Sequence, residues 1–368
     1  MRRSRLYSYV RRAANTLLAC ADYLFPQARM RSRPLAIHIE YNDYCNARCI
    51  QCARENPDIP RNTGQWTLDM LERISPWLPS AGYVGIAGLG EPFISETLLD
   101  FLERIVQAGP APSVITNGTL ITPEKAERLA GMGPMLLNVS IDGATRETFE
   151  KIRVGADFDK VIENLIGLRA AKERKKTPFP IVEINWCLLQ DNVQEMELLP
   201  ALAERIGSQI INLQPAHDFG LPKAAQIHWV SDSEAEAAAQ RLRQAAQPKG
   251  IRVVYTPLNS QWPIDDQAPE GKARCFCPNL WRFLHLDPRG NARVCCMGDF
   301  ELTGNILENS LDDMWRARGM AAVRQALLRG DPPPCCRRCY LLRPYERRQA
   351  ASHLKQYLET IRLGALFQ

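Results

Sequence analysis

The sequence predicts an α/β protein built on a partial barrel of six βα units, followed by a smaller cysteine-rich region. Between residues 35 and 215, short runs of β-forming residues alternate with longer helical patterns, which is typical of a parallel sheet with crossover helices. Six such units fall short of the eight that close a barrel. Ten of the twelve cysteines lie in two blocks, at residues 45–52 and 275–339, and the second block lies outside the βα region.

The elements of the barrel follow one another in a regular order. Runs rich in β-branched and aromatic residues predict strands at 35–40, 83–88, 112–117, 135–142, 180–189 and 209–214. Amphipathic periodicity predicts helices at 68–78, 96–108, 123–131, 146–173 and 193–206. A further helix is expected at 231–247 and a short strand at 251–255.

Four of these strands carry polar residues at every second position, whereas a strand covered on both faces is apolar throughout. A buried polar face costs free energy unless it lines a cavity that holds a polar ligand. We therefore expect a substrate cavity whose polar lining includes Glu183, Asn185, Asn212, Gln214 and His217. Among these, Glu183, Asn185 and His217 are the candidate catalytic residues, since one such group can take a proton from the substrate.

Residues 1–34 form a basic segment. They hold eight Arg and one Asp, a net charge of +7, whereas the whole chain has +5, so the remaining residues sum to −2. Within residues 4–25, apolar side chains recur at helical spacing: Leu6, Tyr9, Val10, Ala13, Leu17, Ala21, Leu24 and Phe25. This amphipathic helix either docks on an anionic membrane or a partner, or packs on the body of the protein with its Arg side chains in water. Because the positive charge is confined to one end, no nucleic-acid partner is expected.

The composition excludes disordered and membrane-spanning proteins. Apolar residues make up 45% of the chain and charged residues 24%, and no apolar run approaches the length of a membrane span. The apolar stretch at 17–21 is too short for a signal peptide and runs into Asp22. We therefore expect a cytoplasmic protein, with peripheral contact to the inner face of the membrane as an option. In that reducing compartment, clustered cysteines are more often metal ligands than disulfides.

The first cysteine block places Cys45, Cys49 and Cys52 shortly after the first predicted strand. Three thiolates in one loop fit a [4Fe–4S] cluster whose fourth iron stays open to a ligand. Zinc is the alternative, but a closed zinc site needs four ligands, and no fourth Cys or His lies nearby in the sequence.

This Cys-x3-Cys-x2-Cys spacing resembles the signature of the radical S-adenosylmethionine (SAM) enzymes. The segments at 88–92 (Gly-Leu-Gly-Glu-Pro), 116–118 (Thr-Asn-Gly) and 140–143 (Ser-Ile-Asp-Gly) are also similar to that family. The resemblance implies a partial, TIM-like (β/α)6 barrel and a cluster bound by Cys45, Cys49 and Cys52. It also implies SAM contacts from Gly90, Glu91, Asn117, Ser140 and Arg153. Residue 51, often aromatic in the family, is Gln in this chain.

The resemblance further implies an activity. SAM bound at the open iron would be cleaved by one electron to methionine and a 5′-deoxyadenosyl radical, which abstracts hydrogen from an unactivated carbon. A donor protein of flavodoxin or ferredoxin type would supply that electron. In such enzymes the protein positions the reactants and excludes water.

The second cysteine block resembles the start of SPASM domains, which bind auxiliary iron–sulfur clusters. A hairpin is predicted at 281–296 with Gly290 in its turn, and a helix at 311–328. No cysteine follows Cys339, so the resemblance is to the truncated, single-cluster form called twitch. It implies one auxiliary [4Fe–4S] cluster bound by Cys277, Cys295, Cys336 and Cys339. Zinc is the alternative metal, and the neighbouring Cys275, Cys296 or Cys335 could replace one of these ligands.

The predicted organisation is therefore a basic helix in 1–34, a radical SAM barrel in 35–256, a SPASM or twitch domain in 257–340 and a helix in 341–368. Four protein thiolates saturate the auxiliary cluster, so its expected task is electron transfer. The leading expectation is the oxidation of a sugar, cyclitol or sugar conjugate, in which a hydroxyl carbon becomes a ketone. A maturase of a ribosomally synthesised peptide is one alternative, and a non-catalytic metal-binding scaffold is another.

Overall fold

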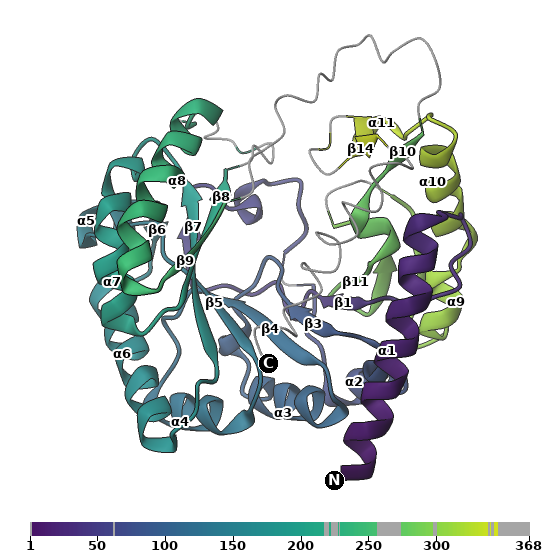
Figure 1. The fold of residues 1–368 in the computed structure, drawn as a ribbon, viewed down its shortest axis with the longest axis horizontal. Coiled ribbons are helices and arrows are strands. Elements are labelled where there is room, and N and C mark those ends of the chain that lie inside the picture. The colour runs from purple at the N-terminus through teal and green to yellow at the C-terminus, as the bar shows by residue number, and fades with distance from the viewer. Residues whose placement is uncertain are drawn as a thin grey trace.

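A computed structural model gives the fold of the chain (Figure 1). It describes residues 2–61, 63–216, 221, 227, 229–255, 274–296, 300–337, 339 and 342–344. Within these ranges the centre is a ten-stranded sheet with the order β13-β12-β11-β1-β3-β4-β5-β7-β8-β9. Figure 1 shows this sheet curved, with helices packed around its outer side. No helix within these ranges combines the length and apolarity needed to cross a bilayer.

Seven neighbouring strands of this sheet are parallel and follow the order of the chain. They are β1 (Ala36–Ile39), β3 (Tyr83–Ile86), β4 (Ala111–Thr116), β5 (Leu136–Ser140), β7 (Ile181–Leu188), β8 (Ile210–Pro215) and β9 (Arg252–Tyr255). The predicted α/β class with a parallel sheet is confirmed.

Six helices on the outside of the sheet are α2 (Leu68–Ile74), α3 (Leu98–Ala108), α4 (Pro123–Met132), α6 (Phe158–Lys175), α7 (Leu199–Ile206) and α8 (Asp232–Ala246). The side chains of Thr67, Thr122, Asp157 and Ser231 cap four of them. Each accepts a hydrogen bond from the third backbone N–H of its helix, a group that would otherwise lack a partner.

The single helix expected at 146–173 is in fact two helices. α5 (Arg146–Ile152) ends at β6 (Arg153–Val154), Gly155 follows with a φ of +90°, and α6 begins at Phe158. β6 pairs antiparallel with β2 (Arg48–Cys49). The break therefore brings the segment that carries Arg153 against the first cysteine block.

The C-terminal region joins the sheet of the barrel. β11 (Phe283–Leu286) pairs in parallel with β1 and antiparallel with β12 (Asn291–Arg293), which pairs in turn with β13 (Leu302–Asn305). The predicted hairpin is thus present, and Gly290 in its turn has a φ of +81°. One apolar cluster runs through both parts of the molecule and includes the fully buried Trp66, Trp186, Trp281 and Trp315.

The helix expected at 311–328 is also divided, into α9 (Leu311–Trp315) and α10 (Arg318–Leu328). The break frees the side chain of Arg316, whose Nε donates to the Met30 carbonyl oxygen at 3.1 Å. Two short elements carry later cysteines. β10 (Cys275–Phe276) carries Cys275 and pairs antiparallel with β14 (Arg343–Pro344). α11 (Pro334–Arg337) carries Cys335 and Cys336. Most of the helix expected in 341–368 lies outside the described residues, and Arg343–Pro344 form a strand instead.

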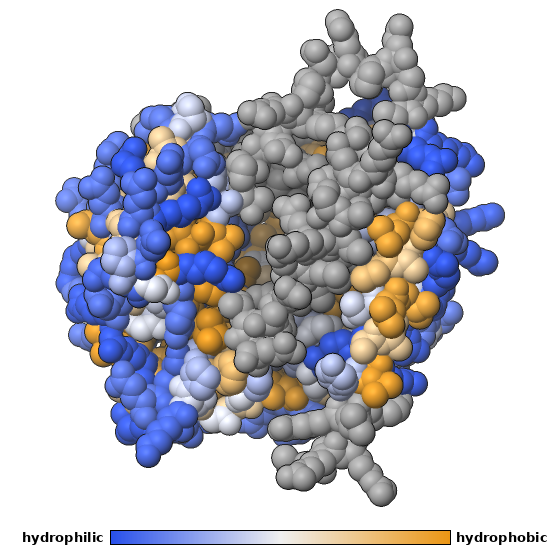
Figure 2. All heavy atoms as spheres, in the orientation of Figure 1, coloured by the Kyte–Doolittle hydropathy of each residue, from blue (hydrophilic) through white to orange (hydrophobic). Residues whose placement is uncertain are grey.

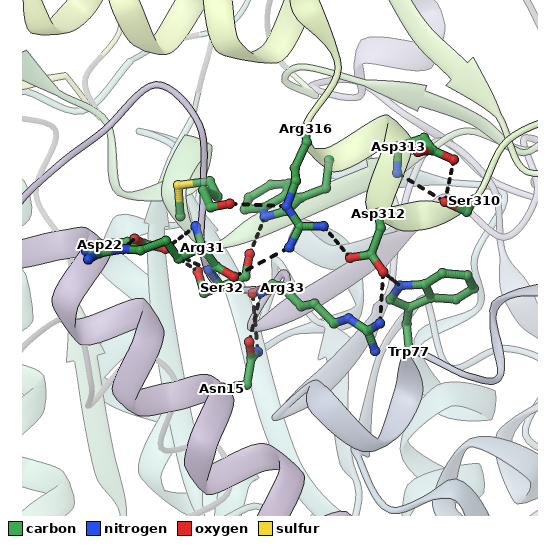
Figure 3. Close-up of polar contacts among 12 residues, drawn as sticks. Asn15, Asp22, Arg31, Ser32, Arg33, Trp77, Ser310, Asp312, Asp313 and Arg316 are labelled. Atoms are coloured by element: carbon green, nitrogen blue, oxygen red, sulfur yellow. Dashed lines mark hydrogen bonds and ion pairs between the residues drawn. The ribbon is translucent and has the colours of Figure 1, made fainter.

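α1 (Arg2–Leu24) lies against the short 3-10 segments η2 (Leu78–Ser80) and η7 (Pro278–Trp281). Figure 3 shows how the residues after α1 join it to α9. The buried Asp22 carboxylate accepts hydrogen bonds from the backbone and side chain of both Arg31 and Ser32, at 2.7–3.0 Å. Arg33 then pairs with Asp312 at 2.8 Å.

The face that α1 buries differs from the one expected for a helix packed on the body. Tyr9, Val10, Leu17 and Phe25 of the apolar stripe are exposed, whereas Ser8, Asn15, Ala19 and Asp22 are buried. α1 thus packs on the body, as one of the two alternatives expects, but the contact is made by its polar side and much of the apolar stripe is exposed.

Candidate active site

The first cysteine block lies in the loop between β1 and α2, at the carboxyl end of the parallel strands, where barrel enzymes hold their reactants. Two contacts fix this loop. The β2–β6 pairing is extended by a hydrogen bond from the Ile50 N–H to the Ile152 carbonyl oxygen at 3.0 Å. On the other side, Asn46 is bound by Asn117, which ends β4: the Asn117 Nδ2 donates to the Asn46 Oδ1 at 2.8 Å.

The structure gives Asn117 the task of holding this loop. Its Oδ1 accepts hydrogen bonds from the Thr119 backbone N–H and hydroxyl at 3.0 and 2.7 Å, while its amide group binds Asn46. The residue is buried, with 6% of its surface exposed. Because Asn46 stands directly after Cys45, Asn117 positions the cysteines through the loop backbone.

The three thiols of Cys45, Cys49 and Cys52 are close enough to influence one another. Burial is the main cause that raises the pKa of all three thiols, and the pKa of Cys49 reaches about 11 with contributions from Cys45 and Cys52. Arg153 opposes this effect, since its Nη1 lies 3.6 Å from the Cys49 Sγ. A buried cation beside three thiols suits a group that binds them as thiolates.

Within the described ranges, no three Cys, His, Asp or Glu side chains converge as they would on a single ion. A [4Fe–4S] cluster does not need such convergence, because each thiolate binds a different iron. The donor set of three thiols in one loop therefore fits such a cluster with one open iron better than it fits zinc.

Asp142, directly after β5, is the centre of the polar contacts beside the cysteines. Its fully buried carboxylate pairs with the Arg153 Nη2 at 2.7 Å and accepts hydrogen bonds from the Gln51 Nε2 at 2.8 Å and the Cys187 N–H at 2.7 Å. The Gln51 Oε1 and the Arg153 Nε are buried without a partner among the described residues. Sequence reasoning did not name Asp142 or Gln51 as site residues; a carboxylate that ends a parallel strand was the available signal.

Glu91 joins the ends of β3 and β4. Its buried carboxylate accepts hydrogen bonds from the Phe93 N–H at 3.0 Å, the Thr116 hydroxyl at 2.7 Å and the Asn117 N–H at 2.6 Å. Burial raises its pKa, and these hydrogen bonds oppose that effect. Most of its hydrogen-bonding capacity is thus taken up inside the protein.

Gly90 follows β3 and Ser140 ends β5, and β4 lies between these two strands. A Cβ atom at Gly90 would lie 1.8 Å from the Asn42 Oδ1, so only glycine permits the close approach of this segment to the cysteine loop. The Asn42 Oδ1 itself is buried without a partner within the described ranges. Ser140 is partly exposed at the end of β5 and is in register with Asn185 of β7.

The inner face of the sheet carries the polar residues expected from the alternation. Asn185 and Asn212 are in register, and the Asn212 Nδ2 donates to the Asn185 Oδ1 and to the Glu183 Oε1, each at 3.0 Å. Glu183 is 7% exposed, and burial raises its pKa to about 7. Gln214 lies farther along β8 and is exposed, and His217 lies outside the described residues.

Two histidines that were not among the expected site residues lie on the same inner face. His38 of β1 is in register with His285 of β11, and their rings are 5.2 Å apart, edge to face. Burial lowers the pKa of His38 to about 4 and that of His285 to about 3, so both are neutral at pH 7. The alternation in the first strand pointed to His38, but no local pattern placed β11 beside β1.

The second set of cysteines also comes together. Cys277 precedes η7, Cys295 follows β12, and Cys336 lies in α11. Burial is the main cause that raises the pKa of Cys277 to about 12, and Cys295 and Cys339 contribute to this increase. Burial, Cys277 and Cys295 also raise the pKa of Cys336. These four thiols, from three segments of the chain, therefore lie near enough to interact, and four is the number of thiolates that a fully ligated cluster requires. Cys296 and Cys335 are exposed neighbours that interact with Cys295 and Cys336, and Cys275 is half-buried on β10.

An open cavity of about 430 Å³ lies elsewhere, between α6 and α7. Its lining includes Arg169, Lys172, Glu204 and Gln209, which belong to the helices or to the segments that lead into the strands. It therefore lies at the amino ends of the strands and contributes no residue to the site described above.

Comparisons with known proteins agree with this site. The radical SAM superfamily model matches residues 39–196, and the model of the SPASM iron–sulfur cluster-binding domain matches residues 275–340. The mycofactocin maturase MftC of Mycobacterium tuberculosis is 26% identical over 300 residues, which are 77% of this chain and 70% of that protein. The AdoMet-dependent heme synthase of Methanosarcina barkeri is 27% identical over 310 residues, 78% of this chain and 83% of that protein.

Among solved structures, Streptococcus suis SuiB has a similar fold, with a TM-score of 0.65 and 15% identity over 80% of this chain and 68% of that one. The two family models match the two regions that carry the two cysteine sets. The chain therefore belongs to the radical SAM superfamily and has a C-terminal SPASM iron–sulfur domain.

Proposed function

We propose that the protein is a maturase that removes hydrogen from a peptide substrate in an oxidation. Its cofactors are SAM, a SAM-binding [4Fe–4S] cluster and an auxiliary [4Fe–4S] cluster. Two similar proteins support a peptide: MftC is named a maturase, and a structure of SuiB contains its precursor peptide SuiA. Oxidation of a sugar or cyclitol, the leading expectation from the sequence, has less support, although the heme synthase shows that similar proteins also serve other products.

The observation that carries the proposal is the likeness of the chain to MftC and to SuiB, and a row of side-chain amides on the inner face of the sheet is compatible with it. The Asn138 and Asn212 Nδ2 groups donate within the protein, which leaves their oxygens and the Asn185 amide nitrogen for the N–H and C=O groups of a peptide. Amides bind sugar hydroxyls equally well, so the substrates of the relatives decide between the two classes.

In this proposal, different residues of the chain bind the two clusters and accept the substrate proton. Cys45, Cys49 and Cys52 hold the group that, when bound, supplies the electron for SAM cleavage. Glu183, with a pKa of about 7, is suited to accept the proton that the substrate loses after hydrogen abstraction. Cys277, Cys295, Cys336 and Cys339 hold the group that takes the remaining electron, and a partner of flavodoxin or ferredoxin type supplies the electron that starts each turnover.

Mass spectrometry under anaerobic conditions tests this function. The cluster-loaded protein is incubated with SAM, a reductant and either candidate peptides or sugars, and formation of 5′-deoxyadenosine is measured in parallel. We expect a peptide to lose two hydrogens and Cys49→Ala to abolish both products. Oxidation of a sugar with every peptide unchanged would refute the peptide assignment while leaving the radical chemistry in place.

A further inference from the structure

α1 attaches to the body of the protein through its polar face. The Arg12 Nη2 donates to the Gly109 carbonyl oxygen at 2.7 Å, at the C-terminus of α3, where a cation is favoured by the helix dipole. The Asn15 Nδ2 donates to the carbonyl oxygens of Arg33 and Ser80 at 3.2 and 3.1 Å. With Asp22 bound to Arg31 and Ser32, these contacts fix how the helix is rotated about its axis.

The opposite face of α1 is apolar and exposed. The exposed fractions are 66% for Tyr9, 57% for Val10, 72% for Leu17, 45% for Leu18 and 53% for Phe25. Val10 and Leu17 lie about two turns apart along one side of α1, and Phe25 follows directly after its last residue, Leu24. Figure 2 shows the result as a hydrophobic stripe over α1. Single exposed apolar residues are common, but a continuous stripe marks an interaction surface.

The segment that carries this stripe is strongly basic. Residues 1–34 have a net charge of +7, and their one acidic side chain, Asp22, is buried and paired with Arg31 at 2.7 Å. No carboxylate of this segment is therefore exposed to oppose an approaching anionic surface.

We propose that the outer face of α1, defined by Tyr9, Val10, Leu17, Leu18 and Phe25, docks on an anionic lipid bilayer. An apolar stripe on a segment with a net charge of +7 matches such a surface in two ways: the stripe enters the acyl boundary, and the positive charge of the segment attracts the headgroups. Since the polar face stays bound to α3 and the linker, the helix lies along the surface with the body of the protein behind it.

Other occupants match the charge less well. A second copy would bring two segments of +7 together. Residues 345–368 of the same chain hold four Lys or Arg and two Glu, a net charge of +2, and would also be repelled. An acidic protein would satisfy the charge, and the experiment separates it from lipid.

Co-sedimentation of the full, cluster-loaded chain with vesicles tests the proposal. The two probes are vesicles of pure phosphatidylcholine and vesicles of phosphatidylcholine with phosphatidylserine. We expect binding to the anionic vesicles, weaker binding at high salt, and little binding to the neutral ones. Leu17→Glu should reduce the affinity for anionic vesicles about tenfold or more, because it replaces buried apolar surface with a repelled charge.

The matched control is Leu198→Glu, because Leu198 is 49% exposed and directly precedes α7, which lies on the opposite side of the molecule from α1 in Figure 1. This variant should bind like the unaltered protein, and the melting temperatures of both variants should be unchanged. Equal binding by the Leu17→Glu variant, or equal affinity for neutral and anionic vesicles, would overturn the proposal. The proposal would also be overturned if the protein did not bind vesicles but instead dimerised, or bound an acidic protein, in a way that Leu17→Glu prevents.

Discussion

Replacing Glu183 with Gln should stabilise the protein in a pH-dependent way. The carboxyl group is 7% exposed, and burial raises its pKa from 4.5 to about 7. In the unfolded chain the group ionises above pH 4.5, whereas in the folded protein it keeps its proton until about pH 7. Folding is therefore penalised increasingly as the pH rises from 4.5 to 7, and the full penalty at high pH is about 3 kcal/mol.

About 2 kcal/mol of this penalty develops between pH 5.5 and 8.5. Gln keeps the oxygen that accepts the hydrogen bond from the Asn212 Nδ2 but carries no charge. The stability of the Glu183→Gln protein relative to the unaltered one should thus increase by about 2 kcal/mol across this range.

Urea denaturation of the cluster-loaded protein at several pH values measures this difference. Glu195 is the control, because hydrogen bonds from Thr145 and Thr148 outweigh burial and lower its pKa. Glu195→Gln should therefore lower stability throughout the range. If the difference between Glu183→Gln and the unaltered protein does not change with pH, the carboxyl group is not held protonated by burial and its assignment as a base at neutral pH fails.

Three further changes test the site and the hairpin. Asp142→Asn leaves the Arg153 guanidinium, 12% exposed, without its anion and should cost about 3 kcal/mol of unfolding free energy in urea. Asn117→Ala frees the loop at Asn46 and should lower the iron bound by the first cysteine set but not the second, which iron analysis and electron paramagnetic resonance can separate. The backbone at Gly290 has a φ of +81°, and a Cβ atom there would lie 2.6 Å from the Ile306 Cγ1, so Gly290→Ala should lower the free energy of unfolding by about 2 kcal/mol or more. Gly250 has a φ of +67° but open space around it, so Gly250→Ala should lower that free energy by about 1 kcal/mol. Thermal unfolding measures both variants.

The strands of the barrel could be predicted because their side chains alternate within each strand. The polar positions of β7 and β8 were identified in this way, and Glu183, Asn185 and Asn212 do lie together. The division of the helix at 146–173 was missed, since periodicity continues across Gly155 while the backbone there turns to a φ of +90°. The contact of Arg153 with Cys49 depends on that turn.

Local sequence patterns could not predict the contacts between distant parts of the chain. The His38–His285 pair exists because β11 adds to β1 across more than 240 residues of sequence. The outward face of α1 was left open for a similar reason. Periodicity identified the apolar stripe, but the choice of which side is buried depends on distant partners such as the Gly109 carbonyl oxygen, which binds Arg12.

The parallel pairing of β11 with β1 affects how the protein can be divided. An iron–sulfur extension connected through a flexible tether could be exchanged between enzymes as an independent cassette. Here, removing the chain after residue 274 would expose an edge of β1 and take Trp281 and Trp315 out of the shared apolar core, so the barrel would lose part of its core together with the iron–sulfur domain. Transplants onto other barrels should therefore take β1 along with the extension.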